Sequence, residues 1–88
     1  MEYRWRSGRT YKKINRTQAR RLFERGEWIH LMPSKIPFDS KWMSPAVIHR
    51  EYELSFDSAV NAFDYYNCNS ETGRCSYYVE VKERYEYV

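Results

Sequence analysis

The sequence is poor in the residues that cross-link very small domains. It contains two Cys and two His among 88 residues. Two cysteines cannot build the disulfide framework of secreted mini-domains, so Cys68 and Cys75 are expected to be free thiols. The six residues between them exceed the two to four of common zinc knuckles, and His30 and His49 lack the short mutual spacing of paired histidine ligands. We therefore expect no metal site and no cofactor.

Long apolar runs and catalytic motifs are lacking as well. No stretch reaches about 18 apolar residues, and residues 1–6 lack an apolar signal region, so neither a membrane span nor an export signal is expected. The chain has no Gly-rich phosphate loop, no paired-His metal helix and no nucleophile motif. Cys68 is placed at a helix end without the N-terminal dipole that favours a thiolate, and His30 is interpreted as a core or edge residue of an apolar strand. The sequence thus predicts an intracellular protein without enzymatic activity.

Apolar and aromatic residues, by contrast, are abundant. They make up 42% and 18% of the chain, which is far above the content of a disordered tail. Eighty-eight residues suit a single domain spanning 1–88, with a basic hairpin or arm over 1–14 and a core over 15–82.

Local patterns predict an α+β fold, in which two short helices pack on one face of a small, mostly antiparallel sheet. Asn15 and Gln18 fit a capping box, and Ser55 fits the N-cap of a second helix. The expected elements are a hairpin within 3–14, a helix over 16–25, a buried strand over 27–32, an irregular segment over 33–45, a strand over 47–54, a helix after Ser55 and a half-buried strand over 75–82. The tail 83–87 is expected to extend the last strand or to fray.

Several side chains are assigned to the core from their spacing. The second helix is expected to bury a stripe made of Phe56, Ala59, Val60, Phe63 and Tyr66. Phe23 and Trp28 are placed in the core as well, and the segment 33–45 is expected to pack back through Ile36, Phe38, Trp42 and Met43. A left-handed Asn67 or Asn69 is expected to end the second helix, and Gly73 to supply another positive φ.

Charge is distributed unevenly along the chain. Residues 1–25 hold nine Lys or Arg against Glu2 and Glu24, a net +7, whereas the rest holds six basic and ten acidic residues, a net −4. A basic N-terminal third suits phosphates or an acidic protein surface, because fixed charges steer encounters, and it is equally typical of a solvated face without a partner.

Several strings between residues 17 and 80 carry a resemblance. They are Ala19-Arg20-Arg21-Leu22, Gly26, Ile29–Lys35, Trp42, Pro45, Phe56-Asp57, Val60-Asn61, Phe63, Tyr65–Asn69, Glu71-Thr72-Gly73 and Tyr78-Val79-Glu80. Through them the chain resembles a group of small uncharacterised phage and prophage accessory proteins of Gram-positive bacteria. The resemblance implies a cytoplasmic setting in a bacterial host and supplies no reaction. Proteins of this size in phage accessory regions are often binding proteins that block a host defence, such as a CRISPR effector.

The leading hypothesis is therefore a non-enzymatic, phage-encoded inhibitor that binds a host defence protein, in the manner of an anti-CRISPR. Tyr, Trp and Arg dominate interface hot spots, and the sequence is rich in all three. The predicted partner-binding residues are Arg16, Arg20, Arg21, Arg25, Trp42, Tyr65, Glu71 and Arg74. Tyr65 is either an exposed anchor of this surface or a packing residue of a structural turn over 65–73.

Two alternatives remain open. The first is nucleic-acid binding by the N-terminal third, where aromatic residues that stack on bases alternate with cations: Tyr3, Arg4, Trp5, Arg6, Arg9, Tyr11, Lys12 and Lys13. The second is a small-ligand pocket between sheet and helices that would accept a nucleotide.

Overall fold

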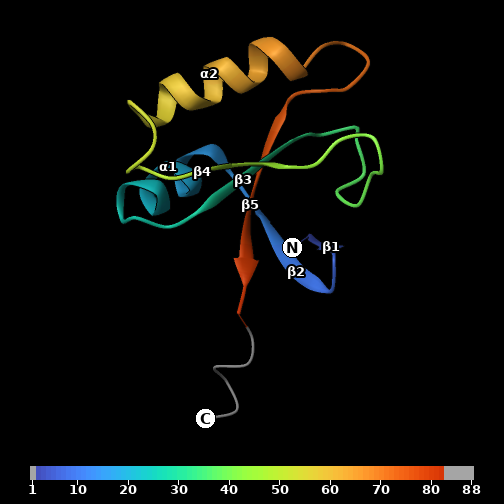
Figure 1. Cartoon of the computed structure of the whole chain (residues 1–88), viewed down its shortest axis with the longest axis horizontal. Coiled ribbons are helices and arrows are strands. Elements are labelled where there is room, and N and C mark those ends of the chain that lie inside the picture. Colours follow the sequence, from blue (N-terminus) through green and yellow to red (C-terminus); the bar gives the residue numbers. More distant parts are fainter. Residues whose placement is uncertain (1, 83–88) are drawn as a thin grey trace.

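The fold is built on one antiparallel sheet with the strand order β1-β2-β5-β3-β4 (Figure 1). The computed structural model describes residues 2–82. The elements are β1 (Tyr3–Arg6), β2 (Arg9–Ile14), α1 (Arg16–Glu24), β3 (Ile29–Pro33), β4 (Ala46–Ile48), α2 (Phe56–Asn67) and β5 (Cys75–Val81). The predicted α+β fold with an antiparallel sheet is confirmed. The predicted tail 83–87 lies outside the described residues.

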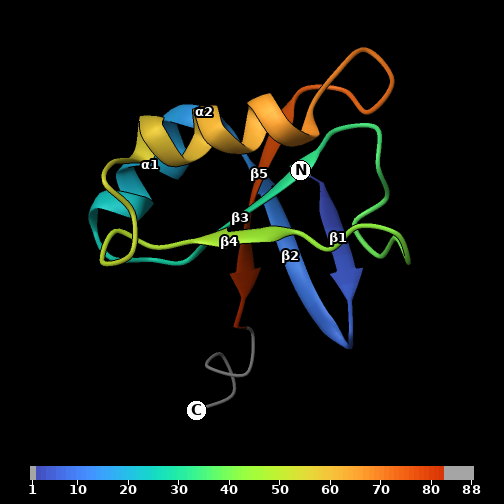
Figure 2. The ribbon, with the colours of Figure 1, turned by 45° about the horizontal axis from the view of Figure 1, so that its top comes forward.

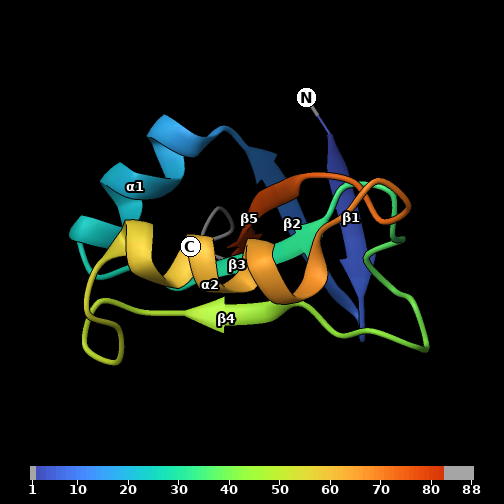
Figure 3. The ribbon, with the colours of Figure 1, turned by 90° about the horizontal axis from the view of Figure 1, so that it is seen from above.

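Both helices lie on the same face of the sheet, which we call the helix face (Figures 2 and 3). The main core fills the space between them. It contains Ala19 and Phe23 from α1, Phe56, Ala59, Val60 and Phe63 from α2, and Ile14, Ile29, Leu31, Ile48 and Tyr77 from the strands. Burial of this apolar surface, rather than intrinsic helix propensity, holds helices of this length in place.

We call the opposite face of the sheet the loop face. It is covered by the segment between β3 and β4. A second core of Tyr11, Met32, Phe38 and Tyr78 forms there. Arg6 fastens the covering segment to β1, since its Nη1 donates to the carbonyl oxygens of Phe38 and Ser40, each at 3.0 Å. The prediction that this segment packs back is confirmed for Phe38, which is 2% exposed, and is wrong for Trp42, which is 96% exposed.

The N-terminal hairpin is an integral part of the sheet. Ser7 and Gly8 both have positive φ, 53° and 77°, as a tight two-residue hairpin turn requires. β2 then pairs with β5, and its residues Tyr11 and Ile14 are buried in the two cores. Residues 2–14 are therefore a hairpin and not a separate arm.

Helix starts were predicted correctly, because capping depends on nearby residues. Asn15 and Gln18 exchange both hydrogen bonds of a capping box, and the Ser55 side chain accepts from the backbone N–H of Ser58. The predicted strand over 47–54 is wrong beyond β4, since the chain turns at His49, whose carbonyl accepts from the N–H of Tyr52 at 2.9 Å.

Three further predictions are wrong, and all three concern residues near the ends of helices or strands. Tyr66 is 79% exposed, because the α2 stripe continues from Phe63 to Asn67, whose side chain donates to the carbonyl of Phe63. Trp28 lies before β3 and is 47% exposed instead of buried. Neither Asn67 nor Asn69 is left-handed, since α2 ends at an extended Cys68, whereas Gly73 has the expected positive φ of 93°.

Candidate functional site

Two of the predicted partner-binding arginines hold the helices together. Arg16 Nη2 lies 3.0 Å from Asp57 Oδ1, and Arg20 Nη1 lies 3.3 Å from Asp57 Oδ2. Both guanidinium groups also lie over the Phe56 ring, at 5.7 and 5.0 Å from its centroid. The hydrogen bonds from Arg20 and Arg16 lower the pKa of Asp57 below its usual value. Arg16 and Arg20 thus link α1 to α2, and a partner would have to compete with Asp57 for them.

Arg21 and Arg25 lie elsewhere on α1. Together with Lys12 of β2 they line a groove of about 290 Å³ on the helix face, whose other lining residues are Ile14, Gln18, Leu22 and Val79. Sequence reasoning placed Lys12 in the nucleic-acid set and the two arginines in the protein-binding set, and the structure brings them together.

The remaining predicted partner contacts are exposed but scattered. Trp42 is 96% exposed on the segment that covers the loop face, whereas Tyr65 is 80% exposed on α2, on the helix face. Glu71 and Arg74 are exposed in the turn that leads to β5. The sheet therefore separates Trp42 and its segment from the Arg-bearing face of α1.

Strand alternation divides the predicted nucleic-acid set between the two faces of the sheet. Lys12 pairs with Tyr3 and Trp5 with Thr10, so alternation assigns these side chains to the helix face. Trp5 also lines a pocket with Pro37, Phe38 and Asp39 of the covering segment. Arg4, Arg6, Arg9, Tyr11 and Lys13 belong to the loop face. Tyr11 is 7% exposed within the second core, so its ring is not available to stack on bases.

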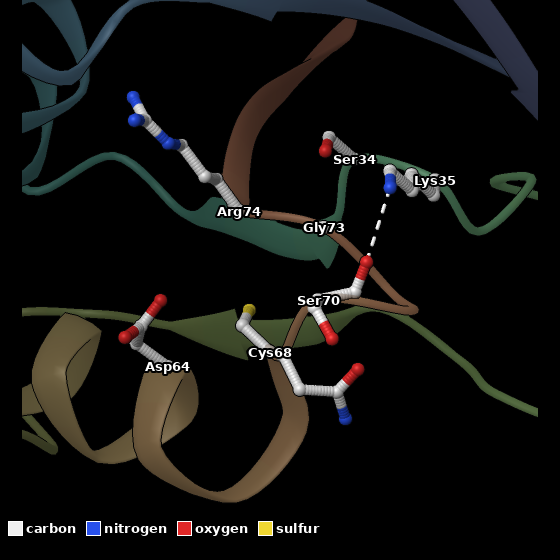
Figure 4. A pocket seen from close by; sticks show the side chains of 8 residues that line it. Ser34, Lys35, Asp64, Cys68, Ser70, Gly73 and Arg74 are labelled. Atoms are coloured by element: carbon white, nitrogen blue, oxygen red, sulfur yellow. Dashed lines mark hydrogen bonds between the residues drawn. The ribbon is translucent and has the colours of Figure 1, made fainter.

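The turn between α2 and β5 is held by its own hydrogen bonds. Asn69 Oδ1 accepts from the backbone N–H groups of Glu71 at 2.8 Å and Thr72 at 2.9 Å. Beside it lies an open pocket of about 430 Å³, across which Lys35 Nζ donates to the carbonyl oxygen of Ser70 at 3.0 Å (Figure 4). The fixed hydrogen bonds support the structural interpretation of this turn.

Both thiols are held in their protonated form. Burial raises the pKa of Cys68, which lines this pocket, to about 11, and that of Cys75 to about 12 (Figure 4). A thiol that remains protonated at neutral pH is a poor nucleophile. The pocket therefore offers hydrogen-bonding groups and the charges of Lys35, Asp64 and Arg74, but no activated thiolate.

Sequence reasoning missed one exposed aromatic cluster, which we call the Trp28 patch and define by Trp28, Val47, Tyr52 and Leu54. The rings of Trp28 and Tyr52 stack with centroids 5.8 Å apart and an interplanar angle of 27°. The buried His49 supports both rings, with centroids 4.4 Å from Trp28 and 5.7 Å from Tyr52. Val47, which lines a groove with Trp28, is 47% exposed, and Leu54, two residues after Tyr52 in the chain, is 97% exposed. The missing signal was the chain reversal after β4, which local patterns did not indicate.

A groove of about 370 Å³ extends from Trp28 and Val47 across the loop face to His30 and Glu80. Burial lowers the pKa of His30, and no partner accepts from or donates to its buried Nδ1 among the described residues. The Tyr11 ring packs against the imidazole at 4.8 Å. These contacts agree with His30 as a neutral, partly buried residue, and its strand β3 is an inner strand that pairs with both β4 and β5.

Within residues 2–82, no group of three or more His, Cys, Asp or Glu is placed to hold a metal ion. No helix of the same stretch is long and apolar enough to cross a membrane. No protein family model, curated protein or solved structure matches the chain.

Proposed function

We propose that this protein is a non-enzymatic binding protein that docks on a host protein through the Trp28 patch. The observation that carries the proposal is the stack of Trp28 on Tyr52 over the buried His49. Trp and Tyr are the residue types most enriched in interface hot spots, and contiguous exposed apolar surface marks interaction sites.

Hydrogen bonds close the turn that carries Tyr52. The backbone N–H of Tyr52 donates to the carbonyl of His49, and His49 Nδ1 accepts from the N–H of Glu51 at 3.1 Å. The Tyr52 ring is in turn stacked on Trp28. A side chain that is already ordered loses little conformational entropy on binding, so more of its contact energy appears as affinity.

The charges around the patch indicate the chemistry of the partner. Glu27 lines the same groove as Trp28, and Glu51 and Glu53 flank Tyr52 in the chain. The neighbouring Arg50 is engaged, since its guanidinium donates to the carbonyl of Glu24. The carboxylates next to Trp28 and Tyr52 are complementary to apolar anchors flanked by basic residues, while Arg9 and Lys82 line the same groove together with Glu80.

The resemblance to phage accessory proteins supports a host defence protein as this partner, acting in the host cytoplasm. Defence proteins that handle nucleic acids, such as CRISPR effectors, carry basic surfaces of the required sign. On this proposal the protein inhibits its target by occupying such a surface, and it catalyses no reaction.

The proposal is tested by expressing the protein in bacteria with an active CRISPR system and measuring phage plating. The wild-type protein is expected to restore plating, and Tyr52→Ala and Leu54→Asp to abolish the effect without lowering Tm, because both side chains are largely exposed. Trp42→Ala, an exposed aromatic outside the patch, is the matched control and is expected to act like wild type.

Two outcomes contradict the proposal. If immunity stays intact in every defence system tested, the protein is not an inhibitor of host defence. Inhibition lost with Trp42→Ala or Tyr65→Ala but kept with Tyr52→Ala and Leu54→Asp would move the docking surface to the residues predicted from the sequence. Binding to the purified effector, measured with the same variants, separates loss of docking from loss of expression.

A further inference from the structure

The two helices do not cover the whole helix face of the sheet in the part of the chain that the structure describes. In Figure 3 α1 lies at the left of the view and β1 at the right, and neither helix lies over β1. The strand register places Trp5, Thr10 and Val81 in one row across β1, β2 and β5, and Lys12 and Val79 in the next row. Trp5 remains 63% exposed on this surface. An exposed aromatic side chain is thus left on the sheet, one row from Lys12, which lines the groove beside α1.

The basic side chains of residues 1–25 fall into two groups: those that bind a carboxylate or carbonyl oxygen of a described residue, and those that do not. Nine Lys or Arg occur in residues 1–25. Five pair with carboxylates, namely Arg4 and Lys13 with Glu2, Arg9 with Glu80, and Arg16 and Arg20 with Asp57. Arg6 donates to two carbonyl oxygens and to the Ser44 hydroxyl. The three left without a carboxylate partner among the described residues are Lys12, Arg21 and Arg25, and all three line the groove beside α1.

We propose that this groove, together with Trp5, is a binding site for single-stranded nucleic acid. The residues that line the groove include three cations and no carboxylate, so a polyanion enters it without repulsion. Lys and Arg that neutralise phosphates release condensed counterions, which supplies affinity without reading sequence. None of the residues that define the Trp28 patch lines this groove.

The exposed Trp5 side chain favours a single-stranded nucleic acid over other polyanions as the ligand. An exposed indole on a sheet stacks on an unpaired base, whose faces are accessible only in a single strand, and such stacking is sequence-tolerant. A duplex hides these faces, and an acidic peptide has none. Trp5 and the cations of the groove therefore match the two components of a single strand, its bases and its phosphates.

The test uses the full chain and a labelled oligothymidylate of about 15 nucleotides, followed by fluorescence anisotropy at about 50 mM salt and upward. Three phosphate contacts on a single strand predict a slope of about −2 for log K against log salt, and Lys12→Gln should reduce it to about −1.4. Trp5→Ala is expected to weaken binding by about fivefold to a hundredfold.

Lys13→Gln is the matched control, since Lys13 is adjacent in the chain but lies on the loop face, with its Nζ 3.3 Å from Glu2 Oε1. It should bind like wild type, as should Tyr52→Ala in the Trp28 patch. Circular dichroism of each variant confirms that the fold is retained. Binding that is absent at low salt overturns the proposal. A loss of affinity with Lys13→Gln as large as that with Lys12→Gln overturns it too. So does an affinity for a duplex or for polyglutamate that equals the affinity for the oligothymidylate. None of these results bears on the Trp28 patch.

Discussion

Arg20 of α1 and Asp57 of α2 form the ion pair that joins the two helices, with Arg20 Nη1 at 3.3 Å from Asp57 Oδ2. Arg16 donates to the same carboxylate, so one acidic residue accepts from two guanidinium groups. Asp57 also lies in the first turn of α2, where the helix dipole favours a negative charge. This arrangement explains why a helix rich in arginine packs closely against its neighbour.

Asp57→Asn is expected to lower Tm by a few degrees at neutral pH, because both guanidinium groups lose their charged partner while the side-chain volume is kept. Exposed ion pairs are weak and salt-sensitive, so the effect should shrink as salt is added. Thermal unfolding checks it, and Asp39→Asn is the control, since Asp39 is exposed and forms no ion pair with any described residue.

The pH dependence of this effect has a definite sign. The pKa of Asp57 is lowered in the folded state, so its stabilising effect is present above the ordinary carboxyl pKa and is lost as pH falls through the folded value. The Tm difference between wild type and Asp57→Asn should therefore be constant near neutral pH, begin to shrink below about pH 4 and disappear below the lowered folded pKa of Asp57. A difference that grows on acidification would contradict the assignment.

Phe38→Ala should destabilise the protein by about 3 to 5 kcal/mol, because the ring fills the second core between Tyr11 and Tyr78, at 4.7 and 4.5 Å between centroids. Trp42→Ala, in the same segment, should change stability by no more than about 0.5 kcal/mol. Urea denaturation measures both. Similar effects of the two substitutions would show that the segment does not pack as described.

Comparing Gly73→Ala with Gly8→Ala distinguishes the cost of a positive φ from the cost of steric overlap with the new Cβ. Both glycines have positive φ, but a Cβ at Gly8 meets nothing within 4 Å, whereas a Cβ at Gly73 runs into Ser34 Oγ and comes to 3.0 Å from the backbone N of Lys35. Gly8→Ala should cost about 1 kcal/mol, and Gly73→Ala clearly more. Equal free energies of unfolding for the two variants would mean that the turn over 69–73 adapts without cost.

The thiols should react slowly with iodoacetamide at pH 7. The pKa values of about 11 for Cys68 and about 12 for Cys75 leave almost no thiolate at that pH, and unfolding in urea should accelerate the reaction by restoring an ordinary thiol pKa. Mass spectrometry at successive times gives both rates. Modification of the folded protein as fast as that of glutathione would show a reactive thiolate and reopen a catalytic interpretation.

The sequence contained the information for the elements and for much of the core. Strand alternation and helix caps depend on residues within about four positions of one another, so Asn15, Ser55 and the stripe from Phe56 to Phe63 were identified from spacing alone. The element ends depend on tertiary packing, as Tyr66 shows: its spacing fits the stripe, but the packed surface ends at Phe63 and Asn67.

The candidate sites depend on contacts that no local pattern describes. The sequence determined that the N-terminal third is basic and aromatic, whereas only the tertiary structure decided that Asp57 neutralises Arg16 and Arg20 while Lys12, Arg21 and Arg25 share a groove. It likewise placed Trp28 on the surface against Tyr52 instead of in the core. The physical reason is that composition fixes which charges and rings a chain carries, but their partners come from segments brought together by the burial of the apolar core.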